Sequence, residues 1–492
     1  MKTLETLRFD NTYAQLPEAF FQRVAPTPFP RPHLVAANPD VMKLLGLDPA
    51  QAGRPEFVDY FSGSRNLPAA DPIAMLYAGH QFGTWVPQLG DGRALLLGEV
   101  VTDAGARWDL QLKGAGRTPF SRRGDGRAVL RSVIREYLCS EAMHGLGVPT
   151  TRALCIIGGD EPVPRERTEP GAMMVRVSPS HVRFGTFQVF ASRDQHDHLR
   201  TLADHVIRRH FPEFLGAPDA PFRLLKAVAE RTGELVARWQ AEGFVHGVLN
   251  SDNMSILGLT IDYGPFAFID RYAHDYVRNH TDHTGFYAYD KQPKIGHFNV
   301  YLLATAMLPL MDKGAAQEGL DAYQPAYQAA FRALMGGKLG LTGCGPGDDE
   351  LMDEVFNLMH RGGADFCSFF RALSGVRADA PSGEVPETCR ALLDPGALEG
   401  AADWFARYRE RLGTEGRDDG ERKHAMDRVN PRYLLRTHLA QAAITRAEDG
   451  DFSEIERLHG LLRDPYTDRP GMEAYGAPPP VDAGEALLSC SS

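Results

Sequence analysis

The segment that most constrains the fold of this chain is a polar stretch, His246-Gly247-Val248-Leu249-Asn250-Ser251-Asp252-Asn253. Histidine and asparagine occupy its first and eighth positions, and an Asp-Tyr-Gly triplet begins at Asp262, nine residues after Asn253. Amide and carboxylate oxygens are ligands that Mg²⁺ and Mn²⁺ prefer, and phosphate oxygens commonly complete such a site. The spacing therefore predicts that Asn253 and Asp262 hold a divalent metal, Mg²⁺ or Mn²⁺, beside a phosphorylated ligand.

Protein kinases place a catalytic loop and a metal-binding loop in the same order, H-R-D-x-x-x-x-N followed by D-F-G. In this chain Val248 stands where the kinase motif has the aspartate that acts as catalytic base. The neighbouring Asp252 is the remaining candidate for a general base. A chain that keeps the metal ligands and lacks the usual base is either an inactive kinase or a nucleotide enzyme with altered chemistry.

The pattern of apolar residues divides the chain into two halves. Strand-like runs at 93–101 and 108–113, the second with period-two alternation, precede an amphipathic helix at 129–143, with Asp125-Gly126 as its expected cap. Helical periodicity then dominates at 199–210, 221–242, 300–311 and 323–335. We predict an α+β, protein-kinase-like fold of two lobes with further extensions. The β-rich N-lobe and an N-terminal extension would span 1–190, and the helical C-lobe and a C-terminal tail 191–492.

A lysine and a glutamate fit this interpretation. Lys113 ends the alternating strand, and Glu136 follows 23 residues later in the helix. Kinases use a strand lysine to hold nucleotide phosphates and a helix glutamate to orient that lysine. For Arg131 and Arg135, on the same helix as Glu136, we expect a solvated helix face.

Glycine turns and arginines supply candidate phosphate contacts. Gly90-Asp91-Gly92-Arg93 occupies the place of a kinase glycine-rich loop, although a plain β-turn explains it equally well. Residues 114–127 (GAGRTPFSRRGDGR) are glycine-rich and basic, and they precede a helix N-terminus, which favours phosphate. Arg176 lies in an apolar strand and Arg183 follows in a turn. Each requires a carboxylate or an anionic ligand.

Composition narrows the functional class. The chain of 492 residues carries a net charge of -11, which argues against a general nucleic-acid or anionic-membrane binder. The longest apolar run, 301–311, is too short to span a bilayer. The N-terminus lacks a signal peptide, and the six cysteines form no C-x-x-C pair. These features predict a cytoplasmic protein, which we expect to be a monomer.

Longer strings carry a family resemblance. The chain resembles the selenoprotein O family, also called the YdiU family, over nearly its whole length. The resemblance rests on YAGHQFG (77–83), QLGDGRA (88–94), LQLKGAGRTPFSRRGDGRAVLRSVIREYL (110–138), HGVLNSDNMSILGLTIDYGPF (246–266) and NHTDHTGFY (279–287).

The resemblance implies a pseudokinase fold that binds ATP in a reversed orientation and transfers AMP to Ser, Thr or Tyr hydroxyls of proteins, releasing pyrophosphate. Asp252 would be the base, Lys113 would hold phosphates and pair with Glu136, and Asn253 and Asp262 would bind the metal. The nucleotide pocket would be lined by Gly90, Gly92, Arg93, Lys113, Asp125, Gly126, Arg176, Arg183 and Asp262.

Three questions stay open at the level of sequence. A conventional phosphotransferase and a catalytically silent nucleotide-binding scaffold are the alternative functions, and UTP could replace ATP. Cys490, third from the C-terminus, stands where relatives carry selenocysteine or cysteine. Because Arg278 occupies the position at which some relatives have a second cysteine, the resemblance implies a mixed disulfide through Cys490 rather than an internal one.

Overall fold

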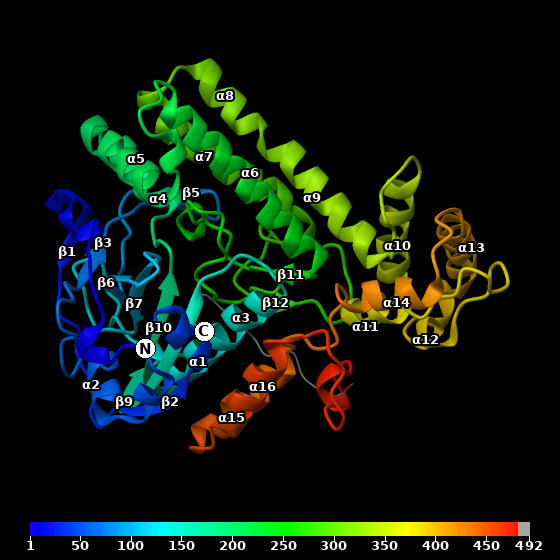
Figure 1. Ribbon diagram of the computed structural model, residues 1–492, viewed down its shortest axis with the longest axis horizontal. Coiled ribbons are helices and arrows are strands. Elements are labelled where there is room, and N and C mark those ends of the chain that lie inside the picture. Colours follow the sequence, from blue (N-terminus) through cyan, green and yellow to red (C-terminus); the bar gives the residue numbers. More distant parts are fainter. Residues whose placement is uncertain (481–492) are drawn as a thin grey trace.

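An antiparallel sheet of eight strands forms one side of the molecule, drawn blue to cyan in Figure 1. The structure, a computed structural model, describes residues 1–480. Strand order is β1-β3-β6-β7-β10-β9-β2, and β8 pairs with β10 beside this path. The strands are β1 (Phe21–Arg23), β2 (His33–Ala37), β3 (Ile73–Met75), β6 (Ala94–Val101), β7 (Arg107–Lys113), β8 (Ala128–Val129), β9 (Arg152–Pro164) and β10 (Thr168–Ser178).

Side chains of β7 alternate between the two faces of the sheet, apolar on one face and polar on the other. Leu110 and Leu112 pack into a core with two N-terminal helices, α1 (Pro39–Leu44) and α2 (Pro55–Phe61). Because successive side chains point to opposite faces, Gln111 and Lys113 point the other way. The strands predicted at 93–101 and 108–113 are confirmed as β6 and β7.

The opposite face of the sheet is covered by α3 (Leu130–Gly145), the helix predicted at 129–143. The expected cap at Asp125-Gly126 is wrong. The N-cap is Val129, whose side chain makes no capping hydrogen bond, because β8 pairs with β10 and leads directly into the helix. Asp125 instead accepts a hydrogen bond from the backbone N–H of Arg127 at 2.8 Å.

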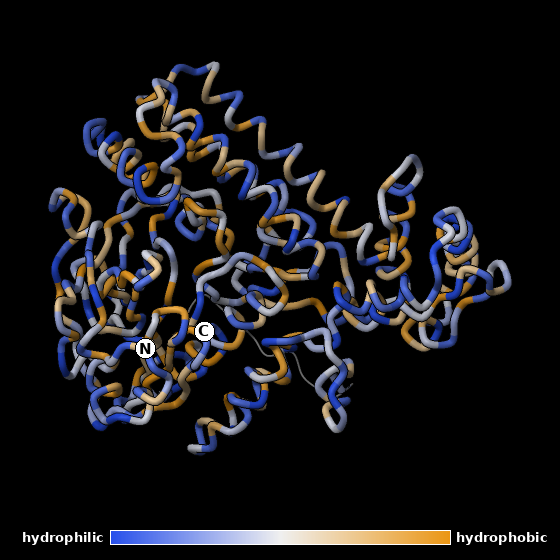
Figure 2. Tube along the Cα trace, viewed as in Figure 1, coloured by the Kyte–Doolittle hydropathy of each residue, from blue (hydrophilic) through white to orange (hydrophobic). Residues whose placement is uncertain are grey.

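Long helices form the part of the molecule drawn green in Figure 1. Their apolar positions recur every three or four residues, and in Figure 2 the helices accordingly alternate between hydrophobic and hydrophilic along their length. The helix predicted at 300–311 begins earlier and ends earlier, because Pro293 suits a first helical turn and Pro309 lies in a following 3-10 turn. The helices are α4 (Phe184–Ala191), α5 (His196–His210), α6 (Ala220–Ala241), α7 (Gln292–Met307), α8 (Lys313–Asp321) and α9 (Tyr323–Lys338).

A second helical layer, yellow to orange in Figure 1, has its own hydrophobic core centred on Trp404 and Phe405. The last two helices return to pack against α3. These elements are α10 (Asp348–Gly362), α11 (Phe366–Leu373), α12 (Glu387–Arg390), α13 (Leu398–Thr414), α14 (Asp419–Asp427), α15 (Thr437–Glu448) and α16 (Ser453–Leu462). Within residues 1–480, no helix is long and apolar enough to cross a membrane.

Candidate active site

A cleft of about 890 Å³ brings the sequence-predicted site residues together. Its walls come from the sheet, from the loops at 89–94 and 117–127, and from the segment 248–265. Glu136 alone among the predicted residues does not line the cleft, and it lies behind Lys113. The predicted residues that line it are Gly90, Gly92, Arg93, Lys113, Asp125, Gly126, Arg176, Arg183, Asp252, Asn253 and Asp262.

A continuous network of buried charges forms the floor of the cleft. Lys113, 3% exposed, donates to Glu136, which is fully buried. Arg176 donates from Nε to Glu136 Oε1 at 2.5 Å and contacts Asp262 Oδ1 through Nη1 at 2.8 Å. Arg183 donates to the other oxygen of Asp262. The strand register explains part of the network, since Arg176 lies directly opposite Gln111 and on the same face as Lys113.

The network sets the protonation of its members. Burial raises the pKa of Asp262, but the charges of Arg183 and Arg176 outweigh it and hold that pKa well below its usual range. Burial likewise raises the pKa of Glu136, and Arg176 and Lys113 reverse the shift. Burial lowers the pKa of Lys113 to about 8, against the opposing charge of Glu136. Both carboxyl groups are therefore ionised at neutral pH.

Asp252 lies in a short 3-10 turn, Ser251–Asn253, at the edge of the cleft. Its Oδ2 accepts a hydrogen bond from Gln81 Nε2 at 3.2 Å, and its Oδ1 is buried without a hydrogen-bond partner among the described residues. Burial raises the pKa of Asp252 to about 6, although the charge of Arg183 opposes the shift. A carboxyl group with a pKa near the working pH is suited to general base catalysis.

Two hydrogen bonds tie the two predicted loops into place. Asn253 donates from Nδ2 to the carbonyl of Val248 at 2.9 Å. The buried ring of His246 reaches the carbonyl of Ile261 through Nε2 at 2.9 Å, immediately before Asp262. Asp262 itself adopts a left-handed backbone with φ of 57°, a strained conformation of the kind found at functional sites. The histidine thus fixes the spacing between the loops.

The cleft is strongly basic although the chain is acidic. Nine arginine and lysine residues line it against four aspartates. Arg127 pairs with Glu161, and Arg165 pairs with Asp125. The side chains of four arginines, by contrast, have no hydrogen-bond or ion-pair partner within residues 1–480; these are Arg93, Arg117, Arg122 and Arg123. Unpaired cations clustered in one cleft favour an anionic ligand.

Glycine is required where the two loops approach each other. A Cβ atom on Gly90, whose φ is 124°, would lie 2.6 Å from the ring of Phe120. Gly126, with φ of 73°, abuts the backbone of Gly116. Gly90 therefore lets the loop at 89–94 approach the loop at 117–127, and Gly126 lets the latter loop fold back against Gly116.

Sequence reasoning missed three polar residues at this site. Asp91 accepts from the backbone N–H of Met75 at 3.1 Å, and burial raises its pKa to about 6. Gln111 links this carboxyl group, at 3.5 Å, to Arg176, from which its Oε1 accepts at 2.9 Å. Gln81 supports Asp252. Gln111 was detectable, because it is a polar residue on the Lys113 face of an alternating strand.

The expectation of a solvated face for Arg131 and Arg135 is wrong. Arg135 is buried, donates to the carbonyl of Phe266 at 3.0 Å and lies over the ring of that residue. Arg131 pairs with the buried Glu169 at 2.6 Å. Arg135 therefore joins α3 to the segment that follows Asp262.

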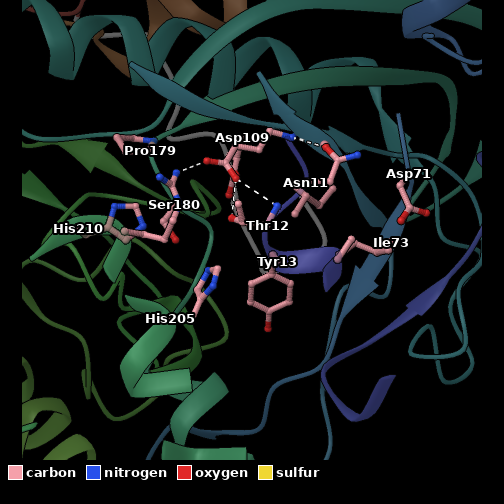
Figure 3. Close-up of a pocket in the computed structure, with 15 residues that line it drawn as sticks. Asn11, Thr12, Tyr13, Asp71, Ile73, Asp109, Pro179, Ser180, His205 and His210 are labelled. Carbon is pink, nitrogen blue, oxygen red and sulfur yellow. Dashed lines mark hydrogen bonds and ion pairs between the residues drawn. The ribbon is translucent and has the colours of Figure 1, made fainter. Parts of the chain in front are cut away.

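A second, enclosed cavity of about 10 Å³ lies between the N-terminal segment, β6, β7 and α5. The rings of Tyr13 and His205 meet edge to face there, at 5.8 Å between centroids (Figure 3). Glu99 accepts from Arg107 at 3.2 Å and also pairs with Arg209. No sequence-predicted site residue lines this cavity.

Comparison with known proteins agrees with the long sequence strings. A family model described as "Protein adenylyltransferase SelO" matches residues 3–463. Proteins called protein nucleotidyltransferase YdiU are similar from end to end, with 100% of each chain covered. The identity is 54% over 493 residues for that of Myxococcus xanthus, 53% over 498 for Thioalkalivibrio sulfidiphilus and 50% over 496 for Thiobacillus denitrificans. The predicted resemblance is confirmed, and the chain belongs to the SelO family of protein nucleotidyltransferases.

Proposed function

We propose that this chain transfers AMP from ATP to Ser, Thr or Tyr hydroxyls of proteins and releases pyrophosphate. The observation that carries the proposal is that the candidate base and the unpaired arginines come from different segments that line the cleft. Asp252, a carboxyl group with a raised pKa and an unpartnered oxygen, lies in the wall formed by 248–265. The four unpaired arginines belong to the loops at 89–94 and 117–127.

This arrangement supports the binding of ATP in the reversed orientation. A triphosphate has most of its negative charge on its terminal phosphates, and charge-assisted bonds to arginine are the strongest contacts available to them. If Arg93, Arg117 and Arg123 hold those phosphates, the α-phosphate is left toward Lys113 and Asp252. A base at Asp252 then faces the α-phosphorus, and no base is needed at Val248.

The transfer step follows from these positions. Asp252 takes the proton of the acceptor hydroxyl as its oxygen forms a bond to the α-phosphorus. The bond between that phosphorus and the oxygen bridging to the β-phosphorus breaks, and the electron pair leaves with pyrophosphate. Lys113 and the arginines stabilise the developing charge, and Glu136 keeps Lys113 in position.

Asn253 and Asp262 fit a divalent metal, Mg²⁺ or Mn²⁺. Asn253 donates its Nδ2 to Val248, so its Oδ1 is the atom available to a ligand, and Asp262 is ionised and lines the cleft. No group of three His, Cys, Asp or Glu side chains within residues 1–480 is placed to hold a metal ion. The bound metal would therefore draw further ligands from phosphate or water, and it would neutralise phosphate charge.

The proposal includes a kinase-like division of the chain, with the sheet and α3 in an N-lobe (1–190) and the catalytic segment in a helical C-lobe (191–492). The chain order of Lys113, Glu136, Asn253 and Asp262 supports it. So does the cleft, which Lys113, Asn253 and Asp262 line, with Glu136 paired to Lys113 behind it. We also propose a cytoplasmic monomer that acts on protein acceptors. A mixed disulfide through Cys490 is part of the proposal, and that residue lies outside the described part of the chain.

Two labelled nucleotides test the reaction. The protein is incubated with ATP carrying ³²P at either the α- or the γ-phosphate, and acid-stable label on protein is measured. We expect label from the α-phosphate only, and label from UTP would extend the donor range. Transfer from the γ-phosphate alone would establish a kinase, and no transfer and no pyrophosphate release would establish a silent scaffold.

Val248→Asp separates reversed from ordinary binding. In an ordinary pose the new carboxylate would restore the kinase base and γ-phosphate transfer. In the reversed pose it adds a buried negative charge beside the phosphates, which costs desolvation and repulsion. We expect loss of AMP transfer, by roughly a hundredfold, and no γ-phosphate transfer.

A further inference from the structure

A short hairpin packs against the catalytic turn. It consists of β4 (Gly79–Gln81) and β5 (Thr84–Val86). The backbone N–H of His80 donates to Ser251 Oγ at 2.7 Å, and Gln81 donates to Asp252. A Cβ atom on Gly79 would lie 2.5 Å from Asp252 Oδ1. The hairpin is therefore the element that faces the proposed base from outside the catalytic segment.

The tip of the hairpin presents an exposed aromatic ring. Phe82 is 37% exposed and lines the mouth of the cleft. Its φ is 49°, in the left-handed region, which is costly for a bulky residue and favours glycine or asparagine. Its backbone N–H donates to Tyr287 Oη at 2.8 Å, and Tyr287 donates to Asn250. Its ring contacts that of Tyr287, with 4.9 Å between centroids, yet more than a third of the residue stays exposed beside the cleft.

Phe82 continues into a strip of apolar side chains. A Cβ atom on Gly83 would lie 3.4 Å from the ring of Phe286, and a Cβ atom on Gly285 would lie 3.2 Å from the side chain of Val277. Val277 is 38% exposed and Phe286 is half-buried. We call Phe82, Phe286 and Val277 the mouth strip. Its three side chains are apolar, and Phe82 directly follows Gln81, which donates to Asp252. The ammonium group of Lys291, which donates to the carbonyl of Gly285 at 2.7 Å, lies beside the strip.

We propose that the mouth strip docks the acceptor polypeptide, through an aliphatic or aromatic side chain within about three residues of the modified hydroxyl. Three residues of extended chain span roughly 10 Å. This inference rests on the proposed function. The arginine-rich loops are suited to the nucleotide, so the acceptor approaches Asp252 past the neutral hairpin. Exposed apolar surface beside a polar cleft is typical of a binding site for a protein segment.

A peptide library reads out this preference. Twelve-residue peptides with one central serine and randomised flanks are incubated with the full-length protein and ATP, and AMP-bearing peptides are sequenced. We expect enrichment of Leu, Ile, Phe or Met within three residues of the serine. The selected peptide should lose roughly tenfold in kcat/KM, through KM, with Phe82→Asn.

Phe82→Tyr is the matched control, since it keeps the ring and should keep the preference. Phe82→Asn relieves the left-handed backbone but loses the ring contact with Tyr287, so the melting temperature should change by no more than about 3 °C. The affinity for ATP should stay within about twofold of wild type. Unchanged peptide selection by Phe82→Asn, or pyrophosphate release without any labelled peptide, would overturn the docking proposal. A lower oligomeric mass for Phe82→Asn than for wild type in light scattering would assign the strip to a second copy of the chain and overturn it too. Failure of wild type to release pyrophosphate would instead contradict the proposed function.

Discussion

The cleft and the small cavity both gather charged side chains, but they differ in how those charges are satisfied. Around the small cavity, Glu99 is shared by Arg107 and Arg209, and Asp109 contacts His181 at 3.2 Å. In the cleft, four arginines have no partner within residues 1–480, and one oxygen of Asp252 is unpartnered there.

The difference separates charges that hold the fold together from charges that await a ligand. A buried ion pair is strongly destabilising to break, because its remaining member keeps the cost of desolvation. Unpaired cations in a solvent-connected cleft are stabilised instead by an arriving anion. Substitutions at the cavity are therefore expected to change stability, and substitutions of the unpaired arginines or Asp252 to change activity. The buried ion pairs in the floor of the cleft, which join Lys113 to Glu136 and Asp262 to two arginines, are expected to affect both.

The largest effect is expected for Asp262→Ala. The substitution removes a proposed metal ligand and the shared partner of Arg176 and Arg183, so AMP transfer should fall by roughly a thousandfold or more. Steady-state transfer of the α-label measures it, with circular dichroism as the control for folding. Wild-type turnover would show that the loop at Asp262 holds no catalytic metal.

Next in size is the coupling between Lys113 and Glu136. Because they form one buried ion pair, Lys113→Ala and Glu136→Ala should each lower kcat/KM by roughly a hundredfold. The double variant should lose little more than either single variant. Losses that multiply in the double variant would mean that the two side chains act independently.

At the cavity, Glu99→Ala should lower the free energy of unfolding by about 1–3 kcal/mol. It leaves Arg107 and Arg209 without their shared carboxylate, and their partial exposure softens the loss. Urea denaturation measures the change, and kcat should stay at the wild-type value. A large fall in kcat with unchanged stability would reverse the assignment of the two regions.

The smallest effect concerns pH. The proposed base, Asp252, must be ionised to accept a proton, so kcat/KM should rise with pH up to its pKa of about 6. It should fall above the Lys113 pKa of about 8, as that cation is lost. The Gln81 hydrogen bond lowers the pKa of Asp252. In Gln81→Ala the acidic limb should therefore move to higher pH, by less than about one unit. An unmoved limb would assign it to another group, such as Asp91.

Features of this fold and site that depend on residues close together in the sequence could be predicted, and features that depend on contacts between distant residues could not. Local alternation of side chains predicts that Gln111 and Lys113 lie on one face of β7. The spacing from His246 to Asp262 identifies the proposed catalytic segment. The ion pair between Arg176 and Asp262 joins residues 86 positions apart and is set by packing alone. Arg135 was misassigned for a related reason: its partners are backbone carbonyls in a distant loop, which leave no signal in residue types.

The central claim is that the unpaired arginines receive the terminal phosphates and leave the α-phosphorus to Asp252. The most direct test is a crystal structure with α,β-methylene ATP and Mn²⁺, in which transfer is blocked. The account predicts that the α-phosphorus lies nearer to Asp252 than the γ-phosphorus does, with the γ-phosphate beside Arg93 and Arg123. A γ-phosphorus nearest Asp252, with the α-phosphate at the arginines, would contradict it.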